Sequence, residues 1–195
     1  MTEMKHRNLG IWDVRKKSEF WKIFSDKINA DFKIITTVSK DFNRLELKSE
    51  YNKVTITLSE TDSTPLFVNC EFNQTRNLTW FEISKSDFID KIMNKFSGKK
   101  ITSGSVEFDK NYLSKTSDNE RIKSIINNRT ITDLILKQKV TFIGGKEEKN
   151  DRFILSLNIH RNINDLQQLA SIYDLTTKLI DEFKGKKTAA SPQTL

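Results

Sequence analysis

The 195-residue chain has little cysteine, histidine, glycine or proline, and these shortages exclude several kinds of site. It holds one cysteine, two histidines, six glycines and two prolines. The lone Cys70 excludes an intrachain disulfide and a cysteine-based zinc site. His6 and His160 do not form a metal-binding motif, and the chain has no G-x-S-x-G elbow for a serine hydrolase. We therefore expect no metal, no cofactor and no catalytic histidine.

The few glycines also leave little material for a phosphate-binding loop. No G-x-G-x-x-G is present, and Gly98-Lys99-Lys100 lacks the upstream glycine of a P-loop. Gly144-Gly145 is predicted to form a hairpin turn with positive φ. Cys70 lies between apolar neighbours in a predicted strand, which favours a buried, unreactive thiol.

Long apolar runs are absent as well. No stretch of about 18 apolar residues could span a membrane, and the first 17 residues lack the apolar core of a secretory signal. Abundant Lys, Asn and Ile are typical of AT-rich bacterial coding. The sequence thus predicts a soluble bacterial protein of the cytoplasm.

What the chain does have is basic charge, with a net charge of +7. Residues 1–30 carry seven basic and four acidic side chains, and residues 98–150 carry eleven and seven. Only eight of the 33 basic residues are Arg, the residue best suited to bidentate phosphate contacts. A solvated surface is the main interpretation, and binding of nucleic acid or an anionic surface through these two segments is the alternative. The candidate anion contacts are Arg15, Lys16, Lys17, Lys99 and Lys100.

Hydrophobic periodicity predicts a helix followed by a strand-rich region. Phe20, Trp21, Phe24 and Ile28 form one stripe at helical spacing, so we expect a helix over residues 13–30. Residues 32–84 alternate between apolar and polar side chains, as in Val54-Thr55-Ile56-Thr57-Leu58, which predicts four or five antiparallel strands with one wet face. The predicted turns are 49–52, 61–65 and 73–77.

The second half is predicted to mix helices and strands. Three S/T-x-x-D/E boxes, beginning at Ser84, Ser117 and Thr130, are interpreted as helix starts. The predicted elements are a helix over about 84–97, extended pieces at 106–108 and 112–113, helices after 117 and 130, strands 139–143 and 152–160 joined by a turn at 144–148, a long helix over about 162–184 and a disordered tail at 185–195.

These elements predict an α+β fold. We expect an antiparallel sheet of about six or more strands with helices packed on one side and a long C-terminal helix. Residues 1–184 would form a single domain. A weak strand–strand–helix echo leaves open two similar halves, about 32–97 and 98–184.

Residues 98–138 resemble an uncharacterised bacterial family of domains of unknown function. The resemblance covers about residues 11–184 and implies no activity. The residues that carry it include Ile11-Trp12 upstream, together with Gly104, Phe108, Asp109, Leu113, Lys115, Ser117, Asp118, Ile131, Leu134, Ile135 and Gln138. Lys99-Lys100 departs from the family pattern, which is often acidic at this point.

The most distinctive stretch of the resemblance supplies the candidate ligand contacts Phe108, Asp109, Lys115 and Asp118. A structural interpretation, a strand followed by a capped helix, competes with a binding loop there. We expect a non-enzymatic binding or protein-interaction module that recognises a protein partner or self-associates. A carboxylate-dependent enzyme is a third hypothesis, with no residues assigned.

Overall fold

A computed structural model describes residues 14–36, 43–61, 64–72, 80–86, 99–116, 119–148, 152–160 and 163–184. Several predictions lie outside these ranges. They are the loose N-terminal start, the turn at 73–77, most of the helix at 84–97, the Ser117 and Asp118 part of the capping box, and the disordered tail at 185–195.

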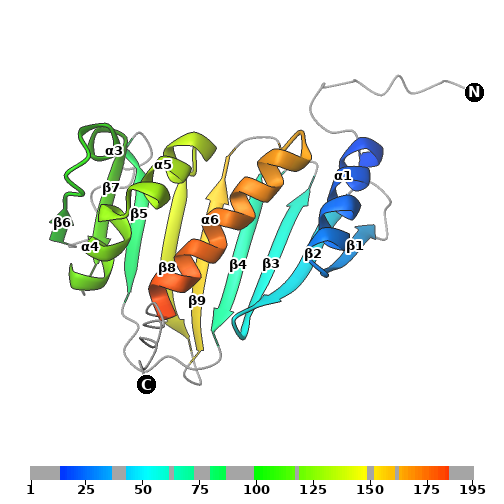
Figure 1. The fold of residues 1–195 in the computed structure, drawn as a ribbon, viewed down its shortest axis with the longest axis horizontal. Coiled ribbons are helices and arrows are strands. Elements are labelled where there is room, and N and C mark those ends of the chain that lie inside the picture. Colours follow the sequence, from blue (N-terminus) through cyan, green and yellow to red (C-terminus); the bar gives the residue numbers. More distant parts are fainter. Residues whose placement is uncertain are drawn as a thin grey trace, which may run out of the picture.

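The described strands form one nine-stranded antiparallel sheet with the order β1-β2-β3-β4-β9-β8-β5-β7-β6 (Figure 1). At its centre, the hairpins β3–β4 and β8–β9 are joined through β4 and β9. The strands are β1 Asp31–Thr36, β2 Asn43–Tyr51, β3 Val54–Thr61, β4 Leu66–Phe72, β5 Phe81–Lys85, β6 Lys99–Ile101, β7 Tyr112–Thr116, β8 Phe142–Glu148 and β9 Arg152–Ile159.

Helices α1, α4, α5 and α6 cover one face of this sheet, and α6 crosses its centre diagonally (Figure 1). The described helices are α1 Val14–Lys27, α3 Val106–Asn111, α4 Asn119–Asn127, α5 Arg129–Gln138 and α6 Leu166–Lys184. The prediction of an antiparallel α+β fold with helices on one side and a long C-terminal helix is confirmed.

Period-two alternation places the core between sheet and helices. In β3 the side chains of Val54, Ile56 and Leu58 are fully buried, whereas the intervening threonine and serine side chains are only half-buried. On the helix side, the rings of Phe72, Phe81 and Phe153 gather around Phe183 of α6, with centroids 5.0 to 6.2 Å from it. Burial of these large apolar side chains is the main force that holds α6 on the sheet.

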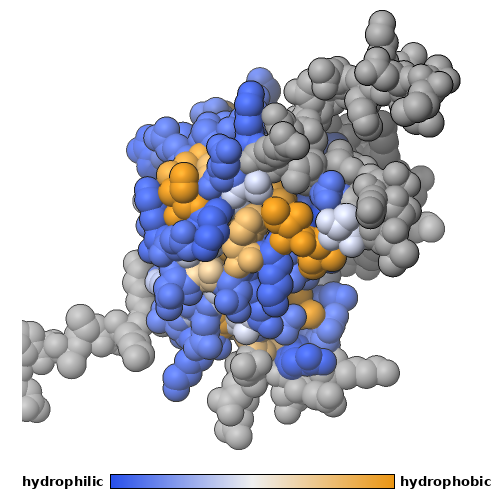
Figure 2. Space-filling view, turned by 90° about the vertical axis from the view of Figure 1, so that its right-hand side faces the viewer, coloured by the Kyte–Doolittle hydropathy of each residue, from blue (hydrophilic) through white to orange (hydrophobic). Residues whose placement is uncertain are grey.

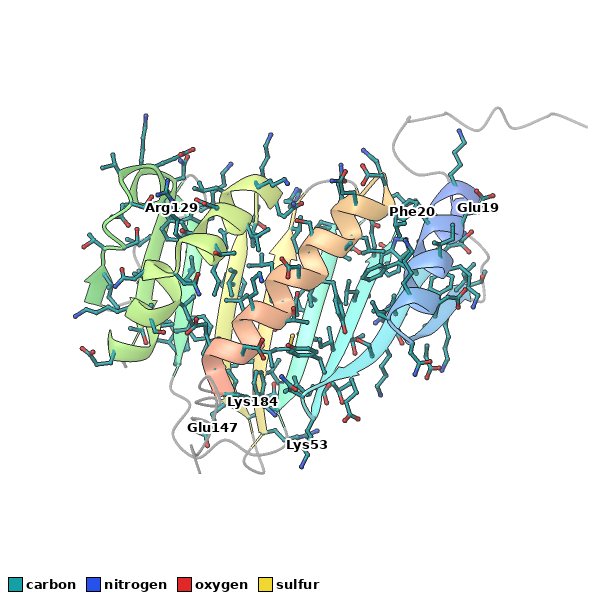
Figure 3. All side chains as sticks on the ribbon, viewed as in Figure 1. Glu19, Phe20, Lys53, Arg129, Glu147 and Lys184 are labelled. Carbon is teal, nitrogen blue, oxygen red and sulfur yellow. The ribbon has the colours of Figure 1, made fainter. Side chains whose placement is uncertain are left out.

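The end of α6 is also fixed to the β2–β3 hairpin. Asp181 accepts hydrogen bonds from the Tyr51 hydroxyl and the Asn52 amide, both at 2.9 Å, and the Lys184 ammonium donates to the Asn52 carbonyl. Lys53 and Lys184 accordingly lie at the same end of the molecule (Figure 3). Asn52 and Lys53 have φ of 48° and 60°, so they form the two-residue turn, and β2 continues through the predicted turn at 49–52 as far as Tyr51.

The predicted turn at Gly144-Gly145 is wrong, because both glycines lie inside β8 and neither has a positive φ. A Cβ on Gly145 would lie 2.0 Å from the Phe81 ring and 2.4 Å from the Phe153 ring. A Cβ on Gly144 would lie 2.4 Å from the Phe142 ring. These positions lack a side chain because aromatic rings occupy the space on both faces of the strand.

Residues 106–108 are helical rather than extended. The Ser105 hydroxyl caps α3 by accepting from the Phe108 backbone N–H, and Glu107 and Asp109 lie in the first turn. The β-propensity of Val106 and Phe108 is overridden here by this local cap. Extended structure at 112–113 is confirmed as part of β7.

Three further predicted helix starts, at Ser84, Thr130 and residue 162, also differ from the structure. Ser84 lies in β5, where its hydroxyl donates to the Glu82 carboxylate, so it caps no helix. Thr130 lies inside α5, whose N-cap residue is Asn128. Helix α6 begins at Leu166 rather than 162, after Asp165 accepts a hydrogen bond from the Gln168 N–H.

Candidate binding groove on the open face of the sheet

The sheet face opposite α1, α4, α5 and α6, called here the open face, carries a groove with a volume of about 1090 Å³. The groove extends from β2 to β5 across the strands between them. Its lining consists of Arg44, Thr57, Ser59, Thr61, Thr64, Pro65, Phe67, Asn69, Lys85, Thr141, Phe142, Asn158 and His160.

Strand register explains how these side chains meet. Ser59 is opposite Phe67, Phe67 is opposite Asn158, and Asn158 is opposite Phe142, so the four side chains form one row across β3, β4, β9 and β8. Phe67 and Phe142 flank Asn158, and two strand spacings separate their backbones by about 10 Å. The two phenyl rings are half-buried and line the groove. The row therefore gives the groove two apolar walls and an amide on its floor.

Hydrogen bonds fix the polar floor next to this row. The Ser156 hydroxyl donates to the Asn69 side-chain oxygen at 2.7 Å. The Thr141 N–H and hydroxyl donate to the Asn158 backbone carbonyl at 2.8 and 2.9 Å. The Lys85 N–H donates to the Thr141 carbonyl at 3.0 Å. The chain segments around Asn158 and Lys85 are thus connected by a continuous set of hydrogen bonds.

The basic lining residues lie at one end of the groove. Arg44 is near the start of β2, Lys85 ends β5 and His160 follows β9, and in this antiparallel sheet these positions share one end. The Arg44 guanidinium pairs with Glu46 on the same strand at 2.6 Å. No carboxylate is among the lining side chains of the described chain. The basic residues of the lining are thus gathered at one end of the groove, where Arg44 is paired with Glu46.

Acidic side chains occupy the same face nearer its other end. Glu50, Thr55, Glu71 and Ile154 form a second row in register, two rows away from Phe67. Lys146 of β8 belongs to this row as well, and Lys48 and Glu82 lie in the row between, so side chains of both charges occupy this part of the open face.

The structure places the candidate ligand contacts Phe108 and Asp109 in structural roles. Phe108 is fully buried in α3 and stacks on Tyr112 with centroids 5.0 Å apart. The Asp109 carboxylate accepts from the Ser103 N–H and hydroxyl, both at 2.8 Å, and so closes the loop before α3. Lys115 lies in β7, where it is buried and opposite Glu82. Asp118 lies outside the described residues. None of the three described residues lines the groove.

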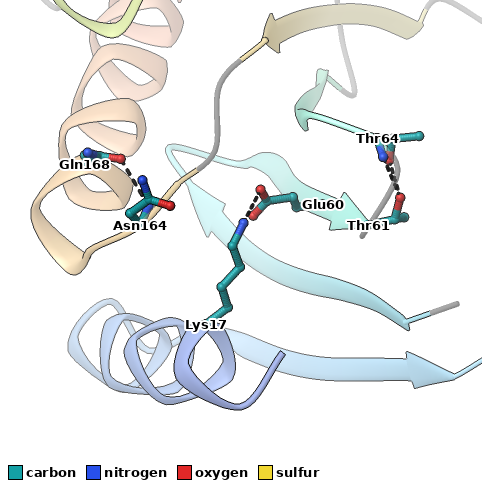
Figure 4. A network of polar contacts seen from close by, with 6 residues as sticks. All are labelled: Lys17, Glu60, Thr61, Thr64, Asn164 and Gln168. Carbon is teal, nitrogen blue, oxygen red and sulfur yellow. Dashed lines mark hydrogen bonds and ion pairs between the residues drawn. The ribbon is translucent and has the colours of Figure 1, made fainter. Parts of the chain in front are cut away.

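Lys17, a candidate anion contact, is instead part of a buried ion pair. Its ammonium lies 2.6 Å from the Glu60 carboxylate, and both side chains are at most 5% exposed (Figure 4). The pair joins α1 to β3 near the contacts of Thr61 with Thr64 and of Asn164 with Gln168. Lys17 is therefore not available to an external anion.

The other candidate anion contacts do not converge on one surface. Lys16 is exposed on α1, and α1, which also contains Arg15, packs beside β1 and β2. Lys99 and Lys100 lie in β6, at the opposite edge of the sheet. Eight strand spacings separate the two edges, or about 40 Å. Lys99 and Lys100 are thus held apart from the basic residues of α1 by the sheet.

Burial favours the neutral forms of two titratable side chains in the core, Cys70 and Tyr112. Burial raises the pKa of the Cys70 thiol far above its usual range. Burial also raises the pKa of Tyr112 to about 12, and its hydroxyl donates to the Val140 carbonyl at 2.8 Å. Within the described ranges, no three His, Cys, Asp or Glu side chains are placed to hold a metal ion. None of the helices in those ranges combines the length and apolar character needed to cross a bilayer.

A second surface is the edge formed by α1 and β1. Figure 2 shows hydrophobic side chains among the polar ones on this side of the molecule. Ile23 of α1 is 50% exposed, and Ile34 and Ile35 of β1 are 46% and 41% exposed. The strand is at the sheet edge, so alternate backbone groups point away from β2.

Comparison with known proteins adds little to this geometry. No family model and no curated protein matches the chain. One solved structure, the crystal structure of the mycobacterial trehalose monomycolate transport factor A, TtfA, is 8% identical, with 87% of this chain and 94% of that chain covered and a TM-score of 0.41. This likeness is too distant to carry an argument. The resemblance to an uncharacterised bacterial family stays a prediction.

Sequence reasoning missed the groove, although two residues gave a signal. Phe67 and Phe142 are large apolar side chains on the outward phase of strands whose inward phase is Val68 and Ile143. A phenylalanine at an outward position of a strand indicates either a surface covered by another part of the protein or a binding site. The gathering of Arg44, Lys85 and His160 depends on strand order, which the sequence does not show.

Proposed function

We propose that this protein is a non-enzymatic binding module and that its ligand occupies the groove on the open face. The observation that carries the proposal is the row Phe67–Asn158–Phe142, in which two rings flank a hydrogen-bonding amide inside a large cavity. Ligand sites are concave, largely apolar and supplied with a few placed polar groups, and the groove has each of these properties.

Matched naphthalene probes of different charge test this proposal. Naphthalene-2-sulfonate, naphthalene-2-sulfonamide and 2-naphthylmethylamine would be titrated by ligand-observed NMR against the wild type and two variants. Thr57→Trp fills the groove, whereas Thr177→Trp makes the same change on α6, on the other side of the sheet. We expect at least one probe to bind the wild type and Thr177→Trp and to lose binding to Thr57→Trp.

The same variants would be examined by native mass spectrometry after gentle purification. A retained small molecule should be present in the wild type and Thr177→Trp and absent from Thr57→Trp. Failure of every probe to bind at millimolar concentration, or equal binding to both variants, would overturn the assignment of the groove.

A second candidate function is self-association through β1, with two copies pairing their edge strands antiparallel about a two-fold axis. The exposed Ile34 and Ile35 favour this function, because an apolar strand at the edge of the described sheet is stabilised by pairing with another strand. Pairing centred on Ile34 would place the two Ile34 side chains together and keep the two Lys33 side chains apart.

Analytical ultracentrifugation tests the second candidate. The wild type is expected to dimerise, and Ile34→Lys with Ile35→Lys is expected to be monomeric with an unchanged unfolding transition. Ile23→Lys, on α1 outside the strand pairing, is the control. A wild type that stays monomeric at high micromolar concentration would contradict this candidate and leave the groove proposal unaffected.

A further inference from the structure

We propose that the ligand of the groove is an uncharged oligosaccharide whose sugar rings lie along a diagonal of three aromatic side chains, Phe67, Phe142 and Trp80. This ligand class rests on the proposed function, because it describes the occupant of the same groove.

The aromatic diagonal crosses the open face from β4 toward β5. Phe67 and Phe142 both line the groove, and their backbones are about 10 Å apart across β9. The Phe142 ring lies over Gly144, where a Cβ would be 2.4 Å from it, so the ring is displaced along β8 toward the level of Trp80. Trp80 is 37% exposed, and with Phe142 it lines a smaller hollow of about 110 Å³ beside the groove. The three side chains thus offer separate apolar surfaces along one line.

The floor beside these rings carries hydrogen-bonding groups that the fold does not use. Within the described ranges, the side chains of Asn158, Ser59 and Thr57 make no hydrogen bond. Asn69 accepts from Ser156 through its side-chain oxygen, and its NH2 group has no partner in the same part of the chain. These side chains are half-buried. Their amides and hydroxyls can donate to and accept from a ligand that carries many hydroxyl groups.

Charged side chains of both signs lie around the groove, and most of them are matched within the fold. The matched sets are Arg44 with Glu46 at 2.6 Å, Lys146 with Glu148 at 3.2 Å, Glu82 with the Ser84 hydroxyl at 2.7 Å, and Lys48 opposite Asp31 in register. Glu82 also lies opposite Lys115 of β7. In the alternation of β5, Lys85 has the phase of Ile83, away from the open face. The surroundings therefore favour neither an anion nor a cation, which leaves an uncharged ligand.

A sugar chain matches these three properties together. A sugar ring has apolar C–H faces, which pack on aromatic rings, and hydroxyl groups around its edge, which hydrogen-bond to amides and hydroxyls. The groove extends from β2 to β5, about 24 Å across the strands, so it is long enough for a chain rather than a single ring. A hydrocarbon chain of the same length would cover the Asn158 amide without pairing it, which costs free energy.

Uncharged tetrasaccharides of three linkage types test the ligand class. Cellotetraose, chitotetraose and maltotetraose would be titrated by ligand-observed NMR against the wild type, with tetragalacturonic acid as the charged comparison. We expect at least one uncharged tetrasaccharide to bind with a Kd of about 1 mM or below. It should bind about five-fold more tightly than the disaccharide of its series, because the longer chain also contacts Trp80. Its affinity should be the same at low and high salt, because no ion pair forms with the ligand.

Three variants assign the binding to the groove. Asn158→Leu removes the amide at a similar side-chain size and should weaken binding about five-fold. The same change at Asn127, which is exposed on α4 on the helix side of the sheet, is the matched control and should have no effect. Trp80→Ala should remove the advantage of the tetrasaccharide over the disaccharide. Thr57→Trp, which fills the groove, should abolish binding, and circular dichroism with the urea midpoint of each variant would show that the fold is kept.

The outcomes distinguish the ligand class from the proposed function. Failure of every uncharged tetrasaccharide at millimolar concentration, with a naphthalene probe still bound, would overturn the sugar ligand and leave the groove as the site. Failure of the sugars and of the naphthalene probes alike would overturn both. Tetragalacturonic acid that binds more tightly than every uncharged tetrasaccharide, and only at low salt, would contradict an uncharged ligand. Sugar binding that Asn158→Leu leaves unchanged would contradict the assignment of the sugar to this floor.

Discussion

Gly145 shows how one residue without a side chain can determine the packing of a whole layer. The rings of Phe81 and Phe153 fill the space that a Cβ would need, at 2.0 and 2.4 Å. Both rings also pack against Phe183 of α6. A side chain at this position would therefore push the strand away from the helix.

We predict that Gly145→Ala lowers the free energy of unfolding by about 2 kcal/mol, since overpacking a filled core typically costs this much. Urea unfolding followed by circular dichroism measures the effect. Combining Gly145→Ala with Phe81→Leu should destabilise less than the sum of the two single changes, because the smaller side chain makes room for the methyl group. Strict additivity would contradict the steric explanation.

Tyr112 makes stability depend on alkaline pH. Burial raises its pKa to about 12 in the folded protein, whereas in the unfolded chain it ionises near pH 10. Below pH 10 the phenol is neutral in both states, and Tyr112 makes its full contribution to the free energy of unfolding. Above pH 10 the unfolded state loses the proton first, so the contribution is lost progressively as pH rises toward 12.

We therefore predict that Tyr112→Phe is less stable than the wild type at pH 8 and that the difference shrinks between pH 10 and 12. The loss at pH 8 reflects the missing hydrogen bond to Val140. Urea midpoints of both proteins at several pH values give the comparison. A difference that stays constant or grows over this range would be inconsistent with the raised pKa.

At the scale of elements, α1 is held to the sheet by packing and by one buried ion pair. Trp21 is fully buried and lies 6.1 Å from the Phe32 ring, and Phe24 contacts Tyr173 of α6 edge-on at 5.5 Å. The Lys17–Glu60 pair lies within this interface. Burying one of these charges without the other costs free energy, so each side chain depends on its partner to remain buried.

We predict that Lys17→Met destabilises the protein by about 3 kcal/mol, because it leaves the Glu60 carboxylate buried without its main counter-charge. The double variant Lys17→Met with Glu60→Leu should recover most of that loss. Chemical unfolding of Lys17→Met, Glu60→Leu and the double variant gives a double-mutant cycle. The same cycle on the exposed pair Lys22–Asp26 is the control. A single-variant effect below about 1 kcal/mol would place the pair among ordinary surface contacts.

Local patterns predicted most elements, and tertiary packing explains the exceptions. Alternation in residues such as Val54, Ile56 and Leu58 identified buried strands, because the apolar or polar character of each side chain indicates the strand face on which it lies. Gly144-Gly145 was mistaken for a turn, because the reason for these glycines is the presence of distant rings. Val106 to Phe108 was mistaken for a strand, because the Ser105 cap outweighed the propensity of two residues.

The candidate site was less accessible to sequence reasoning than the fold. Residues picked for their pattern, Phe108 and Asp109, serve the loop before α3. The groove is assembled from residues of β2, β3, β4, β5, β8 and β9, which approach one another only through the order of the strands. Only the outward phenylalanines, Phe67 and Phe142, were visible beforehand as exceptions to alternation.

At the scale of the whole molecule, the sheet separates the basic residues of α1 from Lys99 and Lys100. The helix with Lys16 lies beside β1 and β2, whereas Lys99 and Lys100 belong to β6 at the far edge. Because a separation of about 40 Å exceeds the Debye length of about 10 Å at 0.1 M salt, the two segments act as independent weak patches.

We predict that Lys16→Glu and the pair Lys99→Glu with Lys100→Glu each reduce the salt concentration needed for elution from heparin, and that the combined variant shows the sum of the two shifts. Elution from a heparin column at fixed pH measures this. Exposed Lys178→Glu on α6 is the control for net charge. A combined shift clearly larger than the sum would mean that the two segments contact one polyanion together.

The order of the strands also affects when the core can form during synthesis of the chain. Strand β9 is formed by residues 152–159, yet it lies between β4 and β8 and, among the described strands, it alone joins β1–β4 to β8, β5, β7 and β6. While the ribosome synthesises the first 150 residues, the early hairpins keep an open edge at β4 and lack the helix α6 that covers them. The nascent chain therefore completes this core only after residues 152–184 have emerged, and a chaperone that shields β4 would act during this interval.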